Sequence, residues 1–509
     1  MPESQKSLYI FSDKIVTPSE VSRPFVDNMI SDKEYEKLSI SSTNAYVENQ
    51  REMYYSMRST EDELKDIRKL SIRNRDFCFT SLYHHLSTSL LTLAFNTLRQ
   101  NAAPGCDGKT WEKYAKKLEY NIKDLRNRII SGSYRPLPVL RRYIPKANGK
   151  LRPLGICSIE DKIVQNALRM IIEQIYEPVF EDFSYGFRPN TRAHDALDTL
   201  AVAIESKDVN YILDADIVGC FDNINKNILM DILKIRIKDK RILQLIRKLL
   251  DAGVLDKGEL SISNDGVVQG SVISPLLANI FLDFVLDKFF KVWKEELAIG
   301  EMYLIRYADD FVICFQSKEE ALRFKEVLED RLKCAGLALS EEKTRLIQFG
   351  KNARNNMDKY EGKKPETFNF LGFCHSCGVA WKTGLFKLVR TTISSRMEKK
   401  ILDIKERLET WLMRAGIKFT IGWTNLVLNG YYKYFAIHGN LDTLSTFRYR
   451  ICLIFFNALH RLSQRCIWNW DKFNRHIGKF IAVPKVQHKY PIYRIKERQE
   501  FLRKCRFLA

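Results

Sequence analysis

Two apolar runs that are long enough to form buried strands each carry aspartates where a strand would end. The run "LIRYADDFVICF" (304–315) contains Asp309 and Asp310, and "LDADIVGCFDN" (213–223) contains Asp216. The acids of the second run are Asp214, Asp216 and Asp222. One Asp-Asp pair could be a solvated turn, because Asp is common in turns. A second acid cluster at a separate strand end changes this interpretation: if the two strands are neighbours, their carboxylates converge.

Carboxylates that converge raise one another's pKa unless a cation lies between them. Hard oxygen ligands of this kind suit Mg²⁺. Two such ions about 3.5–4 Å apart can clamp the attacking and leaving oxygens of a phosphoryl transfer. Asp216 and Asp309 are therefore a candidate metal site. Upstream, Lys146 and Arg152 could bind a triphosphate, or could be two surface cations of a basic protein.

The charge balance favours a polyanionic partner. The 509 residues include 82 Lys and Arg against 62 Asp and Glu, a formal net charge of +20, which suits nucleic acid. The 11 cysteines show no paired framework, which is typical of reduced thiols inside a cell. Cys374 and Cys377 form a lone C-x-x-C without further ligands at zinc spacing, so we expect strand and turn residues. No secretory signal and no membrane-spanning run is recognised, so we expect a soluble protein.

The apolar periodicity predicts an α+β protein. Predicted helices cover residues 61–100, 110–132, 158–180, part of 267–293, and 318–336. Predicted strands lie in 137–156 around a turn at Asn148-Gly149, in 209–221, 302–317, 337–350 and 368–376. The character changes near residue 386, after which three helical stretches are expected, over 391–416, 420–439 and 441–466.

These motifs, in this order, resemble those of group II intron reverse transcriptases, which also act as maturases. The matching stretches are "NAAPGCDG" (101–108), "YIPKANGKLRPLGI" (143–156), "YGFRPNTRAHDAL" (185–197), "DADIVGCFDNI" (214–224), "QGSVISPLLANIFL" (269–282), "LIRYADDFVICF" (304–315), "LSEEKTRLI" (339–347) and "FNFLGF" (368–373). The resemblance covers about residues 75–465, and "TIGWTNLVLNGYYKYF" (420–435) is similar to the maturase domain X.

The resemblance implies a right-hand polymerase. Its expected parts are a polar N-terminal extension (1–60), fingers and palm (61–385), a helical thumb or maturase domain X (386–466) and a basic C-terminal tail (467–509). The tail lacks the His-Asn-His and paired-cysteine motifs of an endonuclease. The resemblance is therefore to the endonuclease-less branch, bacterial or chloroplast-like, in which the tail would only bind DNA.

The resemblance also implies roles for single residues. Asp216 and Asp309 would bind the metal ions, Asp310 would complete the catalytic turn, and Ile217 would add a backbone carbonyl. The implied dNTP-binding residues are Lys146, Arg152, Phe221, Gln269, Gly270 and Lys343. The implied primer grip is Phe370, Leu371, Gly372 and Phe373. Phe221 would block a 2′-OH, or could be ordinary core, and Lys343 would be a general acid for pyrophosphate release.

Three stretches leave alternatives open. "GVVQGS" (266–271) stands where the family usually reads Gly-Thr-Pro-Gln-Gly-Gly, so Ser271 could loosen the turn or alter template contacts. "RPNTRAHDAL" (188–197) departs from the family pattern, so no RNA-contact residue is assigned in this stretch. The tail aromatics could stack on bases or form a small core; they are Trp468, Trp470, Tyr490 and Tyr493.

The implied function is that of an RNA-directed DNA polymerase encoded by a group II intron. It would copy intron RNA into cDNA for retrohoming and bind the intron RNA to assist splicing. Its cofactor would be two Mg²⁺ ions, with Mn²⁺ as a substitute. Its partners would be intron RNA, template RNA with a DNA primer, target DNA and dNTPs, with no membrane and with a homodimer as an open case. It would work in a bacterial cytoplasm, there also at the nucleoid, or in an organelle of a eukaryote.

Two alternatives remain beside that function. One is a domesticated reverse transcriptase in phage defence or DNA repair. The other is a maturase that only binds RNA in splicing, which the intact aspartates and basic residues disfavour.

Overall fold

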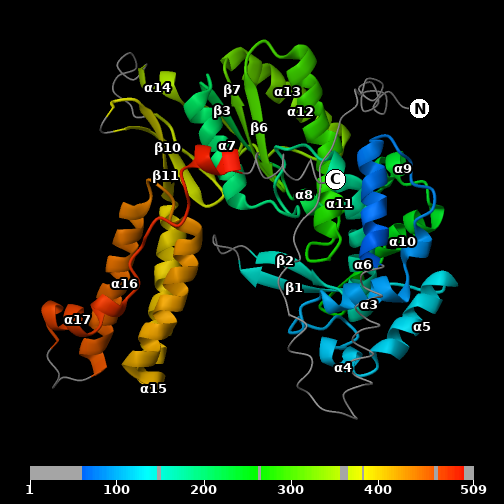
Figure 1. Cartoon of the computed structure of the whole chain (residues 1–509), viewed down its shortest axis with the longest axis horizontal. Helices are drawn as coiled ribbons and strands as arrows, with labels where there is room; N and C mark the ends of the chain where they lie inside the picture. Colours follow the sequence, from blue (N-terminus) through cyan, green and yellow to red (C-terminus); the bar gives the residue numbers. More distant parts are fainter. Residues whose placement is uncertain are drawn as a thin grey trace, which may run out of the picture.

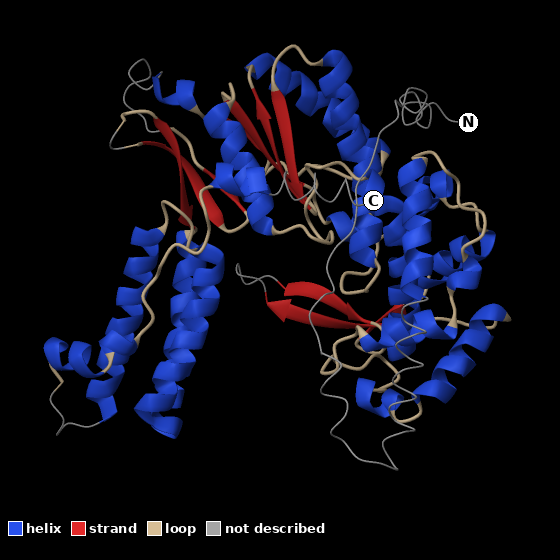
Figure 2. Ribbon diagram, in the orientation of Figure 1, coloured by secondary structure: helices blue, strands red, loops and turns tan. Residues whose placement is uncertain are grey.

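A computed structural model of the chain describes residues 60–145, 151–261, 265–355, 365–380, 383–462 and 468–497. Residues 1–59 of the expected extension, Lys146 and the Asn148-Gly149 turn lie outside the described residues. Figure 2 shows helices and strands intermixed along the chain, which is the expected α+β class. No helix in the described ranges is both long and apolar enough to cross a membrane.

A four-stranded antiparallel sheet forms the centre of the molecule. Its strand order is β6-β7-β3-β8, and β6 and β7 are the predicted hairpin. The strands are β3 (Tyr211–Asp216), β6 (Met302–Tyr307), β7 (Asp310–Phe315) and β8 (Arg345–Gln348). The sheet corresponds to the expected palm.

The two faces of this sheet pack into different cores, because successive strand residues point to opposite sides. Leu213 and Ile313 belong to a core shared with the N-terminal helices and with α11 and α13. Ile212 and Val312 belong to a second core shared with α7 and the C-terminal module. The bounds of these helices are α7 (Ala193–Ser206), α11 (Ser274–Leu282) and α13 (Lys318–Cys334).

The N-terminal lobe combines helices with a small sheet of order β2-β1-β4-β5. The predicted strands around the turn are β1 (Val139–Pro145) and β2 (Leu151–Ile156), and they pair antiparallel. The remaining strands are β4 (Val254–Asp256) and β5 (Glu259–Ser261). The lobe's helices are 60–73, η2 (Tyr83–His85), α3 (Thr88–Asn96), α4 (Trp111–Ala115), α5 (Leu118–Ile130), α6 (Ile159–Tyr176), η3 (Glu177–Val179), α8 (Cys220–Asn223), α9 (Lys226–Arg236) and α10 (Lys240–Leu250).

Two predicted helices of this lobe have different outcomes. The helix predicted over 158–180 is confirmed as α6, and Ser158 caps it by accepting a hydrogen bond from the Asp161 backbone N–H. The single helix predicted over 110–132 is wrong. It is divided into α4 and α5 because Lys117 has non-helical dihedral angles, with φ −129° and ψ 40°.

The apolar stretch after residue 273 forms one continuous helical run with two π-helical segments. The run consists of α11, η4 (Asp283–Asp287), α12 (Lys288–Val292) and η5 (Trp293–Leu297), and η4 and η5 are the π-helical parts. A π-helical turn rotates the following side chains relative to a regular helix. Asp283 and Asp287, the first and last residues of η4, are both buried.

The C-terminal module begins with a second small sheet, β11-β10-β9, and continues into two long helices. Its elements are α14 (Lys351–Asn355), β9 (Phe368–Phe370), β10 (Phe373–Val379), β11 (Phe386–Thr392), α15 (Ser394–Phe435) and α16 (Leu441–Leu462). Helical structure thus starts at Ser394, because residues from 386 first complete strand β11. The first two predicted helices form α15, which Gly416 interrupts with φ 75° and ψ 177°. In Figure 1, α15 and α16 lie side by side at the lower left, away from the N-terminal helices on the right.

The tail folds back from this module to the central body. After α17 (Trp470–His476) and η7 (Gly478–Phe480), the chain runs back toward α7 (Figure 1). The ring of His488 stacks on His194 of α7, with centroids 4.1 Å apart. The Tyr490 hydroxyl donates to Glu205 Oε2 at 3.0 Å. Part of the predicted DNA-binding tail therefore packs against the protein itself.

Candidate active site

The ends of β3 and β7 bring three aspartates together. Asp216 lies directly opposite Asp310 in the register of the two strands, and Asp309 occupies the turn between β6 and β7. Residues opposite one another in antiparallel strands have Cβ atoms about 4.5–5.5 Å apart. The two strand ends are therefore neighbours, which is the condition under which the acid clusters converge.

The three carboxyl groups influence one another. Burial raises the pKa of Asp309, and the charge of Asp216 adds to the rise. Burial, followed by the charges of Asp309 and Asp216, raises the pKa of Asp310 to about 6. Like charges held this close are a feature of sites that a divalent cation neutralises.

Two positive side chains from different parts of the chain face these carboxylates. The Lys343 ammonium lies 2.6 Å from Asp216 Oδ2. The charges of Arg152 and Lys343 lower the pKa of Asp309 against the larger effect of burial. Arg152, on β2, and Lys343, in the segment between α13 and β8, are thus both placed near the aspartates.

The donor set fits a hard divalent cation by its chemistry, since it is made of carboxylate oxygens. Within the described ranges, however, no three acidic, histidine or cysteine side chains already surround a common point. Ile217 follows Asp216 at the end of β3. The flanking hydrogen bonds run from Val218 N to Ala338 O (2.9 Å) and from Ser340 N to the Asp216 carbonyl (2.8 Å). Neither bond uses the Ile217 carbonyl, which the resemblance assigns to the metal.

Phe221 and the Gln269-Gly270 turn lie between the aspartates and the β1–β2 hairpin. Phe221 is partly buried, and its carbonyl accepts a hydrogen bond from Val267 N at 2.7 Å. Gln269 O accepts one from Gly155 N at 2.6 Å. Gly270 has φ 106°, and a Cβ there would lie 2.5 Å from Gly155 O, so only glycine fits this close approach of turn and strand.

Ser271, which departs from the family pattern, anchors this turn. Its hydroxyl donates to Gln165 Oε1 at 2.8 Å, and Val272 N donates to the same oxygen at 3.0 Å. Gln165 and Ser271 are both buried. The loosening that the sequence change suggested is therefore not seen, because α6 holds the turn.

The predicted primer grip is the tight turn between β9 and β10. Leu371 and Gly372 both have positive φ, 46° and 87°, which is typical of a two-residue hairpin turn. Phe370 and Phe373 flank it as a strand pair and are buried. The Tyr434 hydroxyl donates to Leu371 O at 2.8 Å, so α15 holds the turn from below.

Arg396 was not predicted from the sequence. It lies in the first turn of α15, where a basic residue looks like an ordinary solvated one. A Cβ on Gly372 would lie 2.8 Å from its Nη1, and its positive charge acts on the Asp310 carboxyl. The guanidinium therefore connects the predicted primer grip with the carboxylates.

The structure also shows where the remaining sequence motifs of the C-terminal part lie. Cys374 and Cys377 lie in β10, three residues apart and hence on opposite faces of the strand, which excludes a shared metal ion. Trp470 packs against Phe456 and Phe473, with ring centroids 5.3 and 5.2 Å away. This favours the aromatic core that the sequence left open. Tyr493 is exposed.

Residues 144–375 match the family model described as reverse transcriptase (RNA-dependent DNA polymerase). The matched range contains the whole central sheet, the three aspartates and the β9–β10 turn.

Curated relatives extend the similarity beyond this range. Group II intron-encoded protein LtrA of Lactococcus lactis subsp. cremoris is 30% identical over 462 residues, covering 77% of this chain and 76% of LtrA. Protein YkfC of Escherichia coli K12 is 35% identical over 277 residues, 48% of this chain and 72% of its own length. A 91 kDa protein in the cob intron of Schizosaccharomyces pombe is 28% identical over 445 residues, 74% of this chain and 53% of its own length.

Proposed function

This chain belongs to the group II intron-encoded reverse transcriptases, and on that premise we propose that it copies its own intron RNA into DNA and assists the splicing of that RNA. Its activity is RNA-directed DNA synthesis. One observation carries the proposal most directly: Asp216 lies opposite Asp310, with Asp309 in the adjoining turn.

Asp216 and Asp309, with the Ile217 carbonyl, would hold the metal ions. When bound, two Mg²⁺ ions, or Mn²⁺ in their place, would stabilise the attacking and leaving oxygens of phosphoryl transfer. Lys343 pairs with Asp216 through its ammonium. When Asp216 binds metal, this ammonium would leave the carboxylate and bind the triphosphate instead. The same ammonium is then placed to give a proton to the leaving pyrophosphate.

The other proposed residues position substrates. Arg152 on β2 binds the triphosphate by a forked contact, and Lys146 is proposed for the same group from the sequence resemblance. Gln269 and Gly270 line the nucleotide pocket beside β2. The β9–β10 turn, Phe370 to Phe373, supports the primer end. Positioning and electrostatics of this kind account for most of the catalysis of phosphoryl transfer.

The test of the catalytic assignment is Asp309→Ala. DNA synthesis on an RNA template should fall by about a thousandfold or more, because several kcal/mol of transition-state stabilisation is removed. Protein-assisted splicing should stay near the wild-type level, because RNA binding needs no catalytic carboxylate. Asp231→Ala, an exposed aspartate on α9 paired with Lys234, is the matched control. Normal DNA synthesis by Asp309→Ala would refute the assignment.

The splicing role is supported by the relatives whose names place them in introns and by the net charge of +20. The α15–α16 module would grip the intron RNA as thumb or domain X, mainly through phosphates, so binding should weaken steeply with salt. Target DNA as a further partner, and a bacterial or organellar location, belong to the same proposal.

Two assays separate the proposal from its alternatives. A domesticated reverse transcriptase would extend primers without stimulating the splicing of any flanking intron. A maturase that only binds RNA would stimulate splicing without extending primers. A group II intron surrounding the reading frame would identify the RNA to use in both assays.

A further inference from the structure

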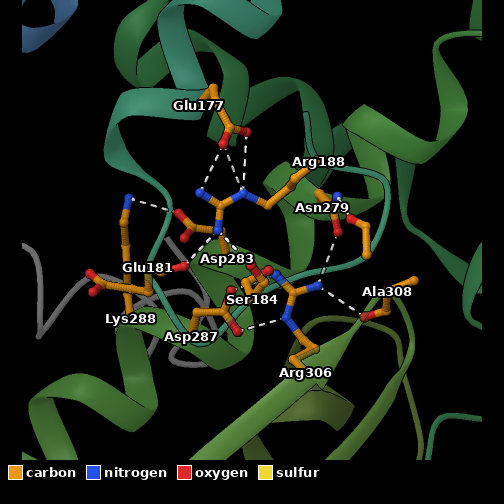
Figure 3. Close-up of polar contacts among 11 residues, drawn as sticks. Glu177, Glu181, Ser184, Arg188, Asn279, Asp283, Asp287, Lys288, Arg306 and Ala308 are labelled. Atoms are coloured by element: carbon orange, nitrogen blue, oxygen red, sulfur yellow. Dashed lines mark hydrogen bonds and ion pairs between the residues drawn. The ribbon is translucent and has the colours of Figure 1, made fainter. Parts of the chain in front are cut away.

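A fully buried arginine lies beneath the catalytic turn. Arg306 is the penultimate residue of β6, three residues before Asp309, and is 0% exposed, as is Asp287 of η4. Figure 3 shows its guanidinium between Asp287, Asn279 and the Ala308 backbone. Its Nε and Nη2 donate to the two Asp287 oxygens at 2.7 and 2.5 Å. Its Nη1 donates to Asn279 Oδ1 at 3.0 Å and to the Ala308 carbonyl at 2.9 Å.

A buried ion pair is weak evidence for a role in stability. Well-packed apolar residues of similar size often stabilise a fold at least as well, because the charges lose their hydration. Asp287 reaches the sheet from a π-helical segment, and such segments are frequent at functional sites. The position of Arg306 is therefore better explained by what the guanidinium holds.

What it holds is the one strained residue of the turn. Ala308 has φ 59°, a left-handed conformation that is unfavourable for any residue with a Cβ. Its carbonyl is the acceptor of the Arg306 Nη1 bond. The peptide group that contains this carbonyl leads directly to Asp309, so its orientation sets the direction in which Asp309 leaves the turn.

The turn is confined from its other side as well. A Cβ at Gly186 would lie 2.3 Å from Ala308 N, so the backbones touch there. Asn279 donates to Gly186 O at 2.7 Å and accepts from Arg306. The side-chain amide of Asn279 therefore connects the Gly186 backbone with the Arg306 guanidinium, the two groups that confine Ala308.

We propose that Arg306 is a positioning residue for DNA synthesis, which holds the Ala308 peptide so that Asp309 and Asp310 point at the metal ions. It touches no substrate. This role rests on the proposed function, and it predicts that loss of the Nη1 donor reduces metal use even in a fully folded protein.

The experiment compares Arg306→Met with the double variant Arg306→Met/Asp287→Leu. The single variant leaves Asp287 buried without its partner and should unfold more easily. The double variant removes both charges and should regain thermal stability close to wild type. It should still lose about tenfold or more in kcat, and its half-saturating Mg²⁺ concentration should rise severalfold, while KM for the template–primer stays unchanged.

Arg306→Lys tests the same role if the double variant does not fold. Lysine keeps a positive charge beside Asp287 but cannot donate to Asp287 and Ala308 in the same fork geometry. We expect a folded protein with lowered kcat and a raised Mg²⁺ requirement. Arg236→Met is the matched control: Arg236 is 5% exposed on α9 and donates to Ile175 O and Ser71 Oγ. It should change stability and leave the Mg²⁺ requirement unchanged.

A folded double or lysine variant with wild-type kcat and Mg²⁺ dependence would overturn the role of Arg306. An equal rise of the Mg²⁺ requirement in Arg236→Met would overturn it too, because the effect would then follow from destabilisation. Absence of DNA synthesis by the wild-type protein in the same assay would instead refute the proposed function.

Discussion

At the scale of single residues, Phe221 is the proposed gate against ribonucleotides. It follows Asp216 by five positions and is partly buried at the start of α8. Phe221→Val would open space where the sugar 2′-position is expected. We predict that the ratio of kcat/KM for an rNTP to that for the matching dNTP rises about tenfold or more, the scale of one lost steric contact.

Single-nucleotide extension of an RNA-templated primer measures that ratio. Phe77→Val, at an exposed phenylalanine between the helix over 60–73 and η2, should leave it unchanged. An unchanged ratio in Phe221→Val would assign Phe221 to core packing alone.

Residues differ in how far the sequence could predict them. Asp216, Asp309 and Asp310 interrupt apolar strands, and this local pattern together with the ordered family motifs is enough to predict their meeting. Arg306 and Arg396 carry no such signal, because their importance comes from tertiary contacts with Ala308 and Gly372. An arginine at a strand end or in a first helical turn usually faces water, and only the fold distinguishes these two.

At the scale of elements, periodicity predicted the strands and most helices but not where packing interrupts them. The helix predicted over 110–132 breaks where Asn121 donates to Tyr114 O and Tyr114 packs beside Phe95. The expected helical module was also placed too early, since β11 pairs with β10 along its whole length. Both misses come from specific hydrogen bonds and strand pairing, which apolar periodicity does not register.

Strand β10 carries an acid-sensitive residue in this small sheet. His375 is 0% exposed and its ring stacks on Phe368 of β9, with centroids 4.7 Å apart. Burial, and then the charge of Arg390 opposite it on β11, lowers the pKa of His375 to about 3. In the unfolded chain the His pKa is about 6.5, so His375 binds a proton there at a pH at which the folded protein does not. Stability is therefore lost as the pH falls below about 6.5.

We predict that wild type loses about 1.4 kcal/mol more than His375→Phe between pH 7.5 and 5.5, because one proton changes stability by that amount per pH unit below the unfolded pKa. Urea unfolding at the two pH values measures the difference, and phenylalanine keeps the ring stacked on Phe368. Equal losses in both proteins would show that His375 does not cause the acid sensitivity.

At the scale of the whole molecule, Asp198 joins three parts of the chain. It lies on α7 and is 1% exposed. Arg390 of β11 reaches it at 3.4 Å, and Arg494 of the tail pairs with its other oxygen. Burial raises the pKa of Asp198 while the two guanidinium groups oppose the rise. The tail, red in Figure 1, thereby ties the α15–α16 module to the central body.

This connection between the tail, the α15–α16 module and the central body should affect how far the enzyme moves along its template before it dissociates. Arg494→Ala removes one of the two cations from a buried carboxylate and frees the returning segment. Since the α15–α16 module is proposed to grip the intron RNA, which is also the template, we expect severalfold shorter products per binding event, with an unchanged rate of adding the first nucleotide. Primer extension with a trap for released enzyme measures both quantities.

Limited proteolysis should cut Arg494→Ala faster between residues 484 and 497, and Arg475→Ala on α17 should behave as wild type. Wild-type product lengths together with wild-type proteolysis in Arg494→Ala would mean that the tail does not set how the module is held.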